Sequence, residues 1–317
     1  MAIKAIYDCD TGGDDATSIA IGAASRNIDI LGITTNFGNL SLEQTLRNTL
    51  ELVDYLGADI PVAKGSSVPL WRPLWVGSKE ERRLPIPGIK EASSKPVEEE
   101  AWEFIADRLR ESDTKVTLIP LAPLTNIAKL MMFEPDLVKE KVGDIIIMGG
   151  SMGWGNESPA AELNFYADPE AAAVVFSFGM PIVMAGLNVC EKAYITAEDN
   201  RRFKDIGTKP AKVFYSLCEY GIENYGFHMQ QLVGEPAIQM YDSLPSVYAL
   251  HPEIFTYEDA HVTIEIDSPM TAGMSICDTR PPFFHNDGSL KKNVKVLTGL
   301  DRAKYFDILE ETFREAE

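Results

Sequence analysis

The sequence is poor in cysteine, in histidine and in positive charge. Its 317 residues include four cysteines, four histidines and 29 Lys or Arg against 48 Asp or Glu, which gives a net charge of −19. The cysteines lie far apart without a Cys-x-x-Cys pair, which argues against a zinc site and against a disulfide framework. Free thiols are typical of a reducing cytosol. The strong negative charge argues against nucleic-acid backbones and anionic membranes as partners.

Long apolar runs are also missing. No run reaches the length of a transmembrane helix, and Asp8 and Asp10 interrupt any signal-peptide core near the N-terminus. We therefore expect a cytoplasmic protein that does not enter a membrane. Because 45% of the residues are hydrophobic, the chain can still bury a sizeable core.

Short β-rich runs alternate with longer helical patterns along the chain. Apolar runs such as Ile145–Ile147 and Ile182–Met184 are typical of strands buried on both faces. The alternation predicts an α/β fold with an open, mostly parallel sheet flanked by helices, Rossmann-like, in a single domain over residues 1–317. The predicted strands are Ile3–Tyr7, Ile28–Thr35, Lys115–Leu121, Asp144–Met148, Pro181–Leu187, His261–Ile266 and Val294–Leu297.

Two of the predicted helices have recognisable ends. Ser41 opens a capping-box sequence before a helix that should reach Leu56, and Gly57 follows. Asp168 provides an N-cap for a second helix that should end near Phe178. Further helices are predicted over Trp102–Leu109 and Ala211–Tyr225. Residues 71–96 have the composition of a long irregular loop, which is either a lid over the strand ends or a plain excursion.

The run Asp8-Cys9-Asp10-Thr11-Gly12-Gly13-Asp14-Asp15 directly follows the first predicted strand. Carboxylates packed this densely repel one another and lose hydration on burial, so a fold tolerates them only with compensation. A hard divalent cation such as Ca²⁺ is the simplest compensation, and the two glycines allow the tight turn that such a site needs. The alternative is a solvated strand-to-helix loop in which an aspartate caps the helix. The motifs that follow favour the metal site.

Further polar motifs follow the predicted strands in a fixed order. They are Thr34–Asn39, Ala122–Ala128, Asn156, Glu162–Asn164, Asp168–Ala172 and Tyr241–Asp242. Together with the acidic run, this ordered set resembles the inosine-uridine-preferring nucleoside hydrolase family. In an open α/β sheet the carboxyl ends of the strands face one crevice, so these motifs can converge although they are far apart in sequence.

The resemblance implies calcium-dependent hydrolysis of the N-glycosidic bond of ribonucleosides, which releases ribose and a free base. It assigns Asp10, Asp15 and Asp242 as carboxylate ligands of Ca²⁺ and Thr125 as a carbonyl ligand, with Asp10 also the general base for a water acidified by the metal. Magnesium suits such a site less well, because it demands stricter octahedral geometry. Family members are often dimers or tetramers, which implies a homo-oligomer. The residues that resemble ribose ligands or line the ribose pocket are Asp14, Asn39, Met148, Asn156, Glu162 and Asn164.

Some members of these motifs have simpler interpretations. Asp168 is expected to be a helix cap, and Asn126 is expected to brace the loop after Thr125. Met148 ends an apolar strand, so it is either a core residue or part of the ribose pocket.

The chain departs from the family in the half of the site that faces the leaving base. Tyr241 occupies the position where many members carry a histidine, and a neutral phenol is a weaker acid than imidazolium. Tyr241 therefore acts as a weak proton donor, stacks on the base or is structural, and the sequence leaves these three roles open. The family's flap over the base corresponds to residues 221–235. There Tyr225 and His228 are candidates for contact with the base, although His228 also fits a favourable helix C-terminus.

Three other functions stay open. The departures from the family near the leaving base favour a hydrolase specialised for a modified nucleoside. The absence of a histidine at position 241 favours a nucleoside- or ribose-binding protein without turnover. The opening Asp8-Cys9-Asp10-Thr11 also resembles haloacid dehalogenase-like phosphatases, with Asp8 as nucleophile and Mg²⁺ as cofactor. The phosphatase interpretation leaves the later motifs unexplained.

Overall fold

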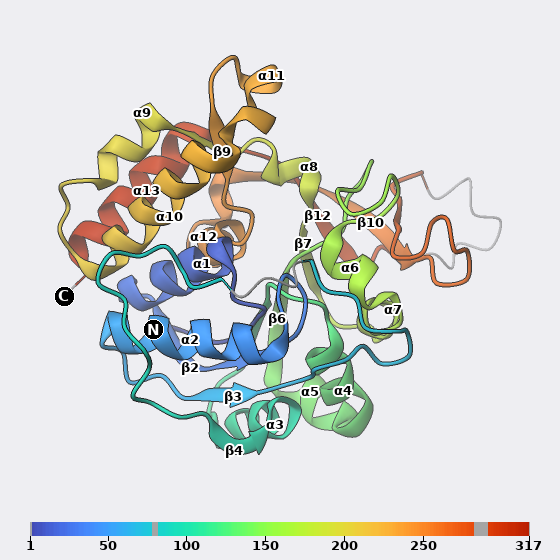
Figure 1. The fold of residues 1–317 in the computed structure, drawn as a ribbon. Coiled ribbons are helices and arrows are strands. Elements are labelled where there is room, and N and C mark those ends of the chain that lie inside the picture. Colours follow the sequence, from blue (N-terminus) through green and yellow to red (C-terminus); the bar gives the residue numbers. More distant parts are fainter. Residues whose placement is uncertain (1, 78–81, 282–290, 317) are drawn as a thin grey trace.

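A ten-stranded sheet runs through the molecule (Figure 1). This computed structural model describes residues 2–77, 82–281 and 291–316. Across the sheet the strands follow the order β11-β10-β12-β7-β6-β5-β1-β2-β3-β4, and β8 and β9 form a separate two-stranded sheet. The strands are β1 (Ile3–Cys9), β2 (Ile28–Thr35), β3 (Val62–Lys64), β4 (Val97–Glu100), β5 (Val116–Pro120), β6 (Val142–Met148), β7 (Ile182–Ala185), β8 (Tyr194–Thr196), β9 (Ala237–Gln239), β10 (Phe255–Ile264), β11 (Ser275–Asp278) and β12 (Val294–Leu300).

Most of the large sheet is parallel. β1 pairs in parallel with β2 and β5, and the parallel pairing continues through β6 and β7 to β12. Within the described residues, β10 is the one strand of this sheet that runs antiparallel to its neighbours, β11 and β12. The predicted open, mostly parallel sheet is therefore confirmed, and the antiparallel edge is a feature that the sequence pattern did not reveal.

The strand order reverses beside β1. The chain runs from β1 outward to β2, β3 and β4, and then returns to place β5 on the other side of β1. Connections leave β1 and β5 in opposite directions, so their carboxyl ends border a crevice that no crossover fills. Asp10 follows β1, and Thr125 follows β5 after a short loop. The two motifs therefore flank the position in the sheet where ligands of such folds bind.

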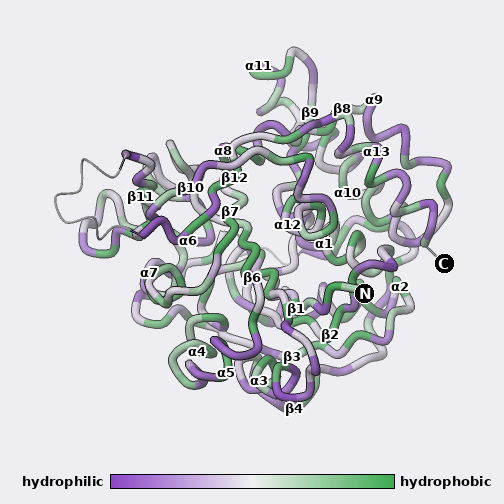
Figure 2. Tube along the Cα trace, turned by 180° about the vertical axis from the view of Figure 1, so that it is seen from behind, coloured by the Kyte–Doolittle hydropathy of each residue, from purple (hydrophilic) through white to green (hydrophobic). Residues whose placement is uncertain are grey.

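Helices cover both faces of the sheet, and the sheet separates two hydrophobic cores. On one face α1, α2, α10, α12 and α13 contribute residues such as Ile19, Leu217 and Phe306, and on the other face α3, α4, α5 and α7 contribute residues such as Ile127 and Val175. Hydrophobic residues are concentrated on central strands such as β6 and β7 (Figure 2). The helices are α1 (Gly13–Ala24), α2 (Leu42–Leu56), α3 (Ala101–Glu111), α4 (Thr125–Phe133), α5 (Pro135–Lys141), α6 (Leu163–Ala167), α7 (Pro169–Ser177), α8 (Leu187–Cys190), α9 (Ala197–Asn200), α10 (Lys209–Tyr225), α11 (Gln230–Val233), α12 (Ser243–Leu250) and α13 (Arg302–Glu315).

The predicted helix caps of α2 and α7 are present in the structure. The Ser41 hydroxyl accepts a hydrogen bond from the Gln44 N–H at the start of α2, and Gly57 ends that helix in the left-handed conformation with φ 72°. The Asp168 side chain accepts a hydrogen bond from the Ala171 N–H and so caps α7. Both helices lie within one residue of their predicted bounds.

Several predicted strands differ in their bounds: β1, β6 and β12 are longer than predicted, and two others differ for a clear reason. The run Pro181–Leu187 is shortened to β7, because Leu187 already begins α8. The run His261–Ile266 is only part of β10, which begins at Phe255. Residues 256–259 of β10 are exposed and mostly polar, so the hydrophobic pattern did not extend to them. Among the described residues, no helix has both the length and the hydropathy to cross a bilayer.

Candidate active site

The acidic run forms the turn between β1 and α1. Asp15, in the first turn of α1, accepts hydrogen bonds from the backbone N–H groups of Asp10 and Gly12, each at 3.0 Å. Because both carboxylate oxygens of Asp15 are used in this way, the turn is closed on itself and the Asp10 backbone is fixed. The turn therefore holds the buried carboxylate of Asp10 at the carboxyl end of β1.

Asp10 is held from a second direction by the loop after β2. Its Oδ2 accepts a hydrogen bond from the Asn39 backbone N–H, whereas its Oδ1 is buried without a hydrogen-bond partner among the described residues. A Cβ atom at Gly38 would lie 2.1 Å from Asp10 Oδ2, so only glycine allows this approach. One oxygen of Asp10 is thus fixed and the other is left available.

Three carboxylates lie together beside Asp10. Ligand oxygens of Asp14, Asp15 and Asp242 all lie within 4.8 Å of one another. Asp242 immediately precedes α12, and its Oδ1 is also buried without a partner among the described residues. Like charges at this separation repel strongly and favour a compensating cation. The structure therefore brings the predicted ligands Asp15 and Asp242 together, with Asp14 completing the group of three.

Burial raises the pKa of every carboxylate in this group. Desolvation is the largest cause, followed by repulsion from neighbouring aspartates, and it raises the pKa of Asp15 to about 7. The pKa values of Asp10 and Asp242 are raised well above their usual range by the same two causes. Protonation or a bound cation can relieve this repulsion, and a cation lowers carboxylate pKa values. Since two buried oxygens lack partners and the donor set is all oxygen, these residues fit a divalent cation.

Glu162 and Asn164 lie where the loop after β6 returns to the sheet. Glu162 caps α6: its side chain accepts hydrogen bonds from the N–H groups of Asn164 at 2.8 Å and Gly150 at 2.9 Å. Burial raises the pKa of Glu162 to about 7. Asn164 Nδ2 donates to the carbonyl oxygens of Leu121 at 2.9 Å and Met148 at 3.2 Å, which ties together the ends of β5 and β6.

The other predicted residues of this region occupy different environments. Met148 is 3% exposed and belongs to a hydrophobic core, although its sulfur lies 3.5 Å from Asn164 Nδ2. Asn156 is exposed, and its Oδ1 accepts a hydrogen bond from the Leu163 N–H at 3.0 Å. Met148 is therefore a core residue that also touches a predicted ribose ligand.

Asp168 caps α7 as expected, and Asn126 is a structural brace, but of the ends of β1 and β2 and not of the loop after Thr125. Asn126 Nδ2 donates to Asp8 Oδ1 at 2.7 Å and to the Thr35 carbonyl at 2.9 Å, and so braces the ends of β1 and β2. The Thr125 hydroxyl donates to Asp168 Oδ2 at 2.6 Å. Asp8 was not expected in this brace. It is a buried carboxylate inside a β-strand with a pKa raised by desolvation to about 7, and its place within an apolar strand was the available signal.

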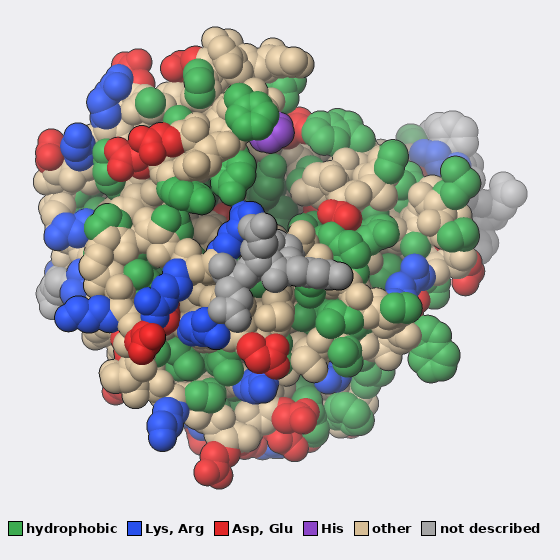
Figure 3. All heavy atoms as spheres, viewed as in Figure 1, with side chains coloured by type: hydrophobic (Ala, Val, Ile, Leu, Met, Phe, Trp, Pro, Cys, Tyr) green, Lys and Arg blue, Asp and Glu red, His purple; other side chains and the backbone are tan. Residues whose placement is uncertain are grey.

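A cavity of about 800 Å³ opens over the acidic turn. In Figure 3 hydrophobic side chains gather around the hollow below α11 and β9. The predicted residues Asp14, Asn39 and Tyr225 line this cavity. Other lining residues had not been predicted, among them Arg82, Glu157, Tyr220 and Gln239. A second cavity of about 730 Å³ lies at the amino ends of β6, β7 and β12 and contains none of the predicted site residues.

Tyr220 and Tyr225 line the cavity, and Tyr241 is hydrogen-bonded to the lining residue Gln239. Tyr225, at the end of α10, is 38% exposed, and its hydroxyl accepts a hydrogen bond from Arg82 Nη1 at 3.0 Å. The Tyr241 hydroxyl donates to Gln239 Oε1 at 2.7 Å, and burial raises the pKa of Tyr241 further above its usual range. His228 is exposed, and its ring lies 3.9 Å from that of Phe227. His228 is not among the residues that line the cavity.

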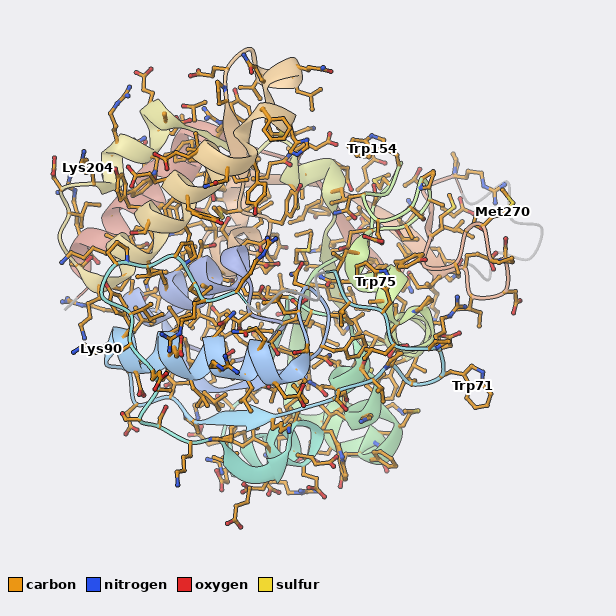
Figure 4. All side chains as sticks on the ribbon, viewed as in Figure 1. Trp71, Trp75, Lys90, Trp154, Lys204 and Met270 are labelled. Atoms are coloured by element: carbon orange, nitrogen blue, oxygen red, sulfur yellow. The ribbon has the colours of Figure 1, made fainter. Side chains whose placement is uncertain are left out.

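The described part of the loop 71–96 packs against the body of the molecule. Trp75 meets Tyr166 edge-on, with ring centroids 5.7 Å apart, whereas Trp71 is 86% exposed and points away (Figure 4). Arg83 forms a 2.7 Å ion pair with Glu51 of α2, whose side chain is buried. Residues 78–81 of the predicted lid lie outside the described residues. The loop as a lid stays a prediction.

Comparison with known proteins gives a consistent result along the chain. The family model for inosine-uridine preferring nucleoside hydrolase matches residues 5–307. The pyrimidine-specific ribonucleoside hydrolase RihA of Citrobacter koseri is 38% identical over 314 residues, which cover 98% of each protein. Among solved structures, a plant nucleoside hydrolase, the PpNRh1 enzyme, matches with a TM-score of 0.86 at 29% identity over 99% of each chain. A purine-preferring ribonucleoside hydrolase from Gardnerella vaginalis matches with a TM-score of 0.85 at 26% identity over 98% of each chain.

Proposed function

Because this chain belongs to the inosine-uridine preferring nucleoside hydrolase family and is a nucleoside hydrolase, we propose that its activity depends on calcium and uses Asp10 as general base. The substrates we propose are pyrimidine ribonucleosides, since relatives that are 38% identical over nearly the whole chain carry the name pyrimidine-specific ribonucleoside hydrolase. The products would be ribose and the free base.

Asp10 Oδ1 and Asp242 Oδ1, which are buried without a hydrogen-bond partner among the described residues, support the choice of metal. We assign Asp10, Asp15 and Asp242 as carboxylate ligands and the Thr125 backbone carbonyl as a fourth ligand. Calcium accepts six to eight oxygen ligands in flexible geometry, which suits a group of carboxylates drawn from two loops. When bound, the ion would compensate the buried negative charge and increase the acidity of nearby water.

The carboxylate of Asp10 is held in one orientation, as a general base requires. Its Oδ2 is fixed by the Asn39 N–H, and its buried Oδ1 has no competing donor among the described residues. Oδ1 is therefore the atom that would take a proton from the attacking water. Cleavage of an N-glycosidic bond passes through a sugar with oxocarbenium character, and the surrounding carboxylates would stabilise that positive charge.

The ribose would bind between the acidic turn and the loop after β6. Asp14 and Asn39 face the cavity and can accept or donate hydrogen bonds to ribose hydroxyls. Asn156, Glu162 and Asn164 are proposed to complete this set. A buried polar site of this kind rejects a sugar that lacks a hydroxyl, because its own groups are then left unpaired.

The available Oδ1 of Asp10 beside the carboxylate group is the observation that carries this proposal. It is tested by reducing-sugar release from purine, pyrimidine and modified ribonucleosides, with the enzyme as purified, after chelation, and after return of calcium or magnesium. Ribose release that is lost on chelation and restored best by calcium would support it. Release that chelation does not change would overturn the metal dependence, and a preference for purines would overturn the substrate class. The predicted homo-oligomer, a dimer or tetramer, is tested separately by light scattering.

A further inference from the structure

A glutamine and a tyrosine form a pair at the end of β9, where the glutamine lines the cavity over the acidic turn. The Tyr241 hydroxyl donates a 2.7 Å hydrogen bond to Gln239 Oε1. Gln239 lines the same cavity as Asp14 and Asn39. The side-chain amide of Gln239 therefore belongs to the wall that would meet the nucleobase when ribose lies on the acidic turn.

The amide group of Gln239 has an unused donor. Its Nε2 is buried and has no hydrogen-bond partner among the described residues. A buried N–H without an acceptor is costly, so such groups are uncommon in folded proteins and point to a partner that binds later. In this arrangement Tyr241 holds the oxygen end of the amide, which leaves the nitrogen end for another partner.

We propose that Gln239 Nε2 donates a hydrogen bond to a carbonyl oxygen of the departing base and thereby selects carbonyl-bearing bases, with Tyr241 as a positioning residue. This inference rests on the proposed ribohydrolase function and adds the group that recognises the base. A carbonyl oxygen on the ring is the acceptor that a neutral N–H donor requires. Pyrimidine bases of nucleosides carry such an oxygen next to the glycosidic nitrogen.

The proposed contact strengthens as the reaction proceeds. When the C1′–N bond breaks, its electron pair stays with the base nitrogen and delocalises onto the ring carbonyl. The water oxygen bonds to C1′ and Asp10 takes the water proton, which returns through solvent to the base. The charge on the carbonyl oxygen rises during this step, so a donor aimed at it stabilises the transition state more than the substrate.

The same geometry gives Tyr241 a defined task. Its hydroxyl proton is already donated to Gln239, and its phenol is half-buried. Of the three roles that the sequence leaves open, the structural one, as the holder of Gln239, agrees best with this contact. The leaving base would be stabilised as an anion by a hydrogen bond and not protonated directly by the phenol.

The test uses Gln239→Met, which keeps the length of the side chain but has no donor. Two substrates are compared: uridine, and p-nitrophenyl riboside, whose leaving group is stable without help. We expect kcat/KM for uridine to fall by about 30-fold, as for loss of one hydrogen bond to a developing charge, while the p-nitrophenyl riboside value stays within about twofold. Gln239→Glu, which still accepts from Tyr241 but cannot donate when ionised, should behave like Gln239→Met. Tyr241→Phe should give a smaller loss, about fivefold, confined to uridine.

Activity on p-nitrophenyl riboside also reports whether each variant is folded. Equal losses on both substrates would overturn the inference in favour of a structural role for Gln239, and an unchanged value for uridine would overturn it outright. Wild-type enzyme that cleaves neither substrate would instead contradict the proposed function. Uridines in which one ring carbonyl oxygen is replaced by sulfur show which oxygen accepts the hydrogen bond from Gln239, because sulfur is a weaker acceptor. Wild-type should discriminate against sulfur at one ring position only, and Gln239→Met should lose that discrimination.

Discussion

The two sides of the cavity are built from different parts of the fold. The proposed sugar side consists of Asp14 and Asn39, which line the cavity, together with Asp10, Asp15, Glu162, Asn164 and Asp242, which are not among its lining residues. Asp10, Asp15, Glu162 and Asn164 are bonded to backbone groups near the ends of central strands. The proposed base side consists of Tyr225 at the end of α10, Gln239 at the end of β9, and Tyr241, which follows β9 and bonds to Gln239. On the sugar side Asp10 and Asp15 are fully buried and Asp14 and Asn39 are half-buried, whereas Tyr225 on the base side is 38% exposed.

This difference corresponds to what each side must recognise. Ribose is common to every proposed substrate, and a site bonded to the backbone of the large sheet holds its groups in one arrangement. The base varies between nucleosides, and side chains outside the large sheet can be exchanged without disturbing the central strands. The departures from the family pattern, Tyr241 foremost, fall on the base side. Selectivity for the base can therefore change while the sugar side stays the same.

The sharpest test of the comparison is removal of one sugar hydroxyl. We expect 2′-deoxyuridine to be cleaved about 10⁴-fold less efficiently than uridine, because buried groups of the sugar side lose a partner. Measurement of kcat/KM for both substrates checks this. A difference below about tenfold would contradict the assignment of these residues to the 2′-hydroxyl.

A change at Asp10 should affect every substrate equally. Asp10→Asn keeps an oxygen for the Asn39 N–H but removes the base, so kcat should fall about 10³-fold for uridine and for p-nitrophenyl riboside alike. The exposed Glu99→Gln is the matched control, and it should leave kcat unchanged. Loss confined to uridine would place Asp10 in leaving-group chemistry and sink its role as base.

Without calcium the folded protein should be less stable at high pH than at low pH, and bound calcium should remove most of this difference. The pKa values of Asp15 and Glu162 are each raised to about 7 in the folded chain, above those of the unfolded chain. At these two groups the folded state binds more protons than the unfolded state, so the stability that they contribute is fully present below their unfolded pKa values and is lost as pH rises through about 7. Without calcium, we expect a melting temperature several degrees lower at about pH 8 than at about pH 5.5, and added calcium should raise the value mainly at the higher pH.

The comparison that checks this effect is a melting curve at both pH values with and without calcium. Asp15→Asn should abolish most of the calcium effect, and Glu99→Gln should retain it. Equal stabilisation by calcium at both pH values would mean that the ion does not compete with these protons.

The smallest expected effect lies on the base side. Tyr225→Phe removes the acceptor for Arg82 Nη1, which links the loop 71–96 to α10. We expect KM for uridine to rise about threefold with kcat unchanged, since one partly exposed hydrogen bond is lost. Tyr257→Phe, on the distant strand β10, is the control. A fall in kcat with unchanged KM would instead place Tyr225 in the chemical step.

The sequence predicted the centre of the fold better than its margins. β2 begins and ends at its predicted residues, and α2 was placed by Ser41 and Gly57, because buried strands and helix caps leave local signals. The antiparallel edge escaped notice, since residues 256–259 of β10 are exposed and carry no hydrophobic pattern. Local signals report burial and capping but not the direction in which an edge strand pairs.

The same limit applies to the site. The carboxylates could be predicted, because dense acidic residues after a buried strand are unusual in themselves. The grouping of Asp14 with Asp15 and Asp242 depends on the direction of each side chain, which spacing does not determine. Gln239 escaped notice for another reason. It ends β9, a short strand that the sequence did not predict, and only the packed structure shows that its Nε2 lacks a partner among the described residues.

The position of β12 has a consequence for synthesis of the chain. β12 is the last strand to be made, yet it lies between β7 and β10 and pairs with both. A nascent chain that has not yet released Val294–Leu300 from the ribosome therefore cannot attach the hairpin of β10 and β11 to the rest of the sheet. Asp10, Asp14, Asp15 and Asp242 are all made before that point, and so a chain interrupted late in translation would carry the acidic turn in an unfinished sheet. Quality control should accordingly recognise the exposed edge of β7 in such products.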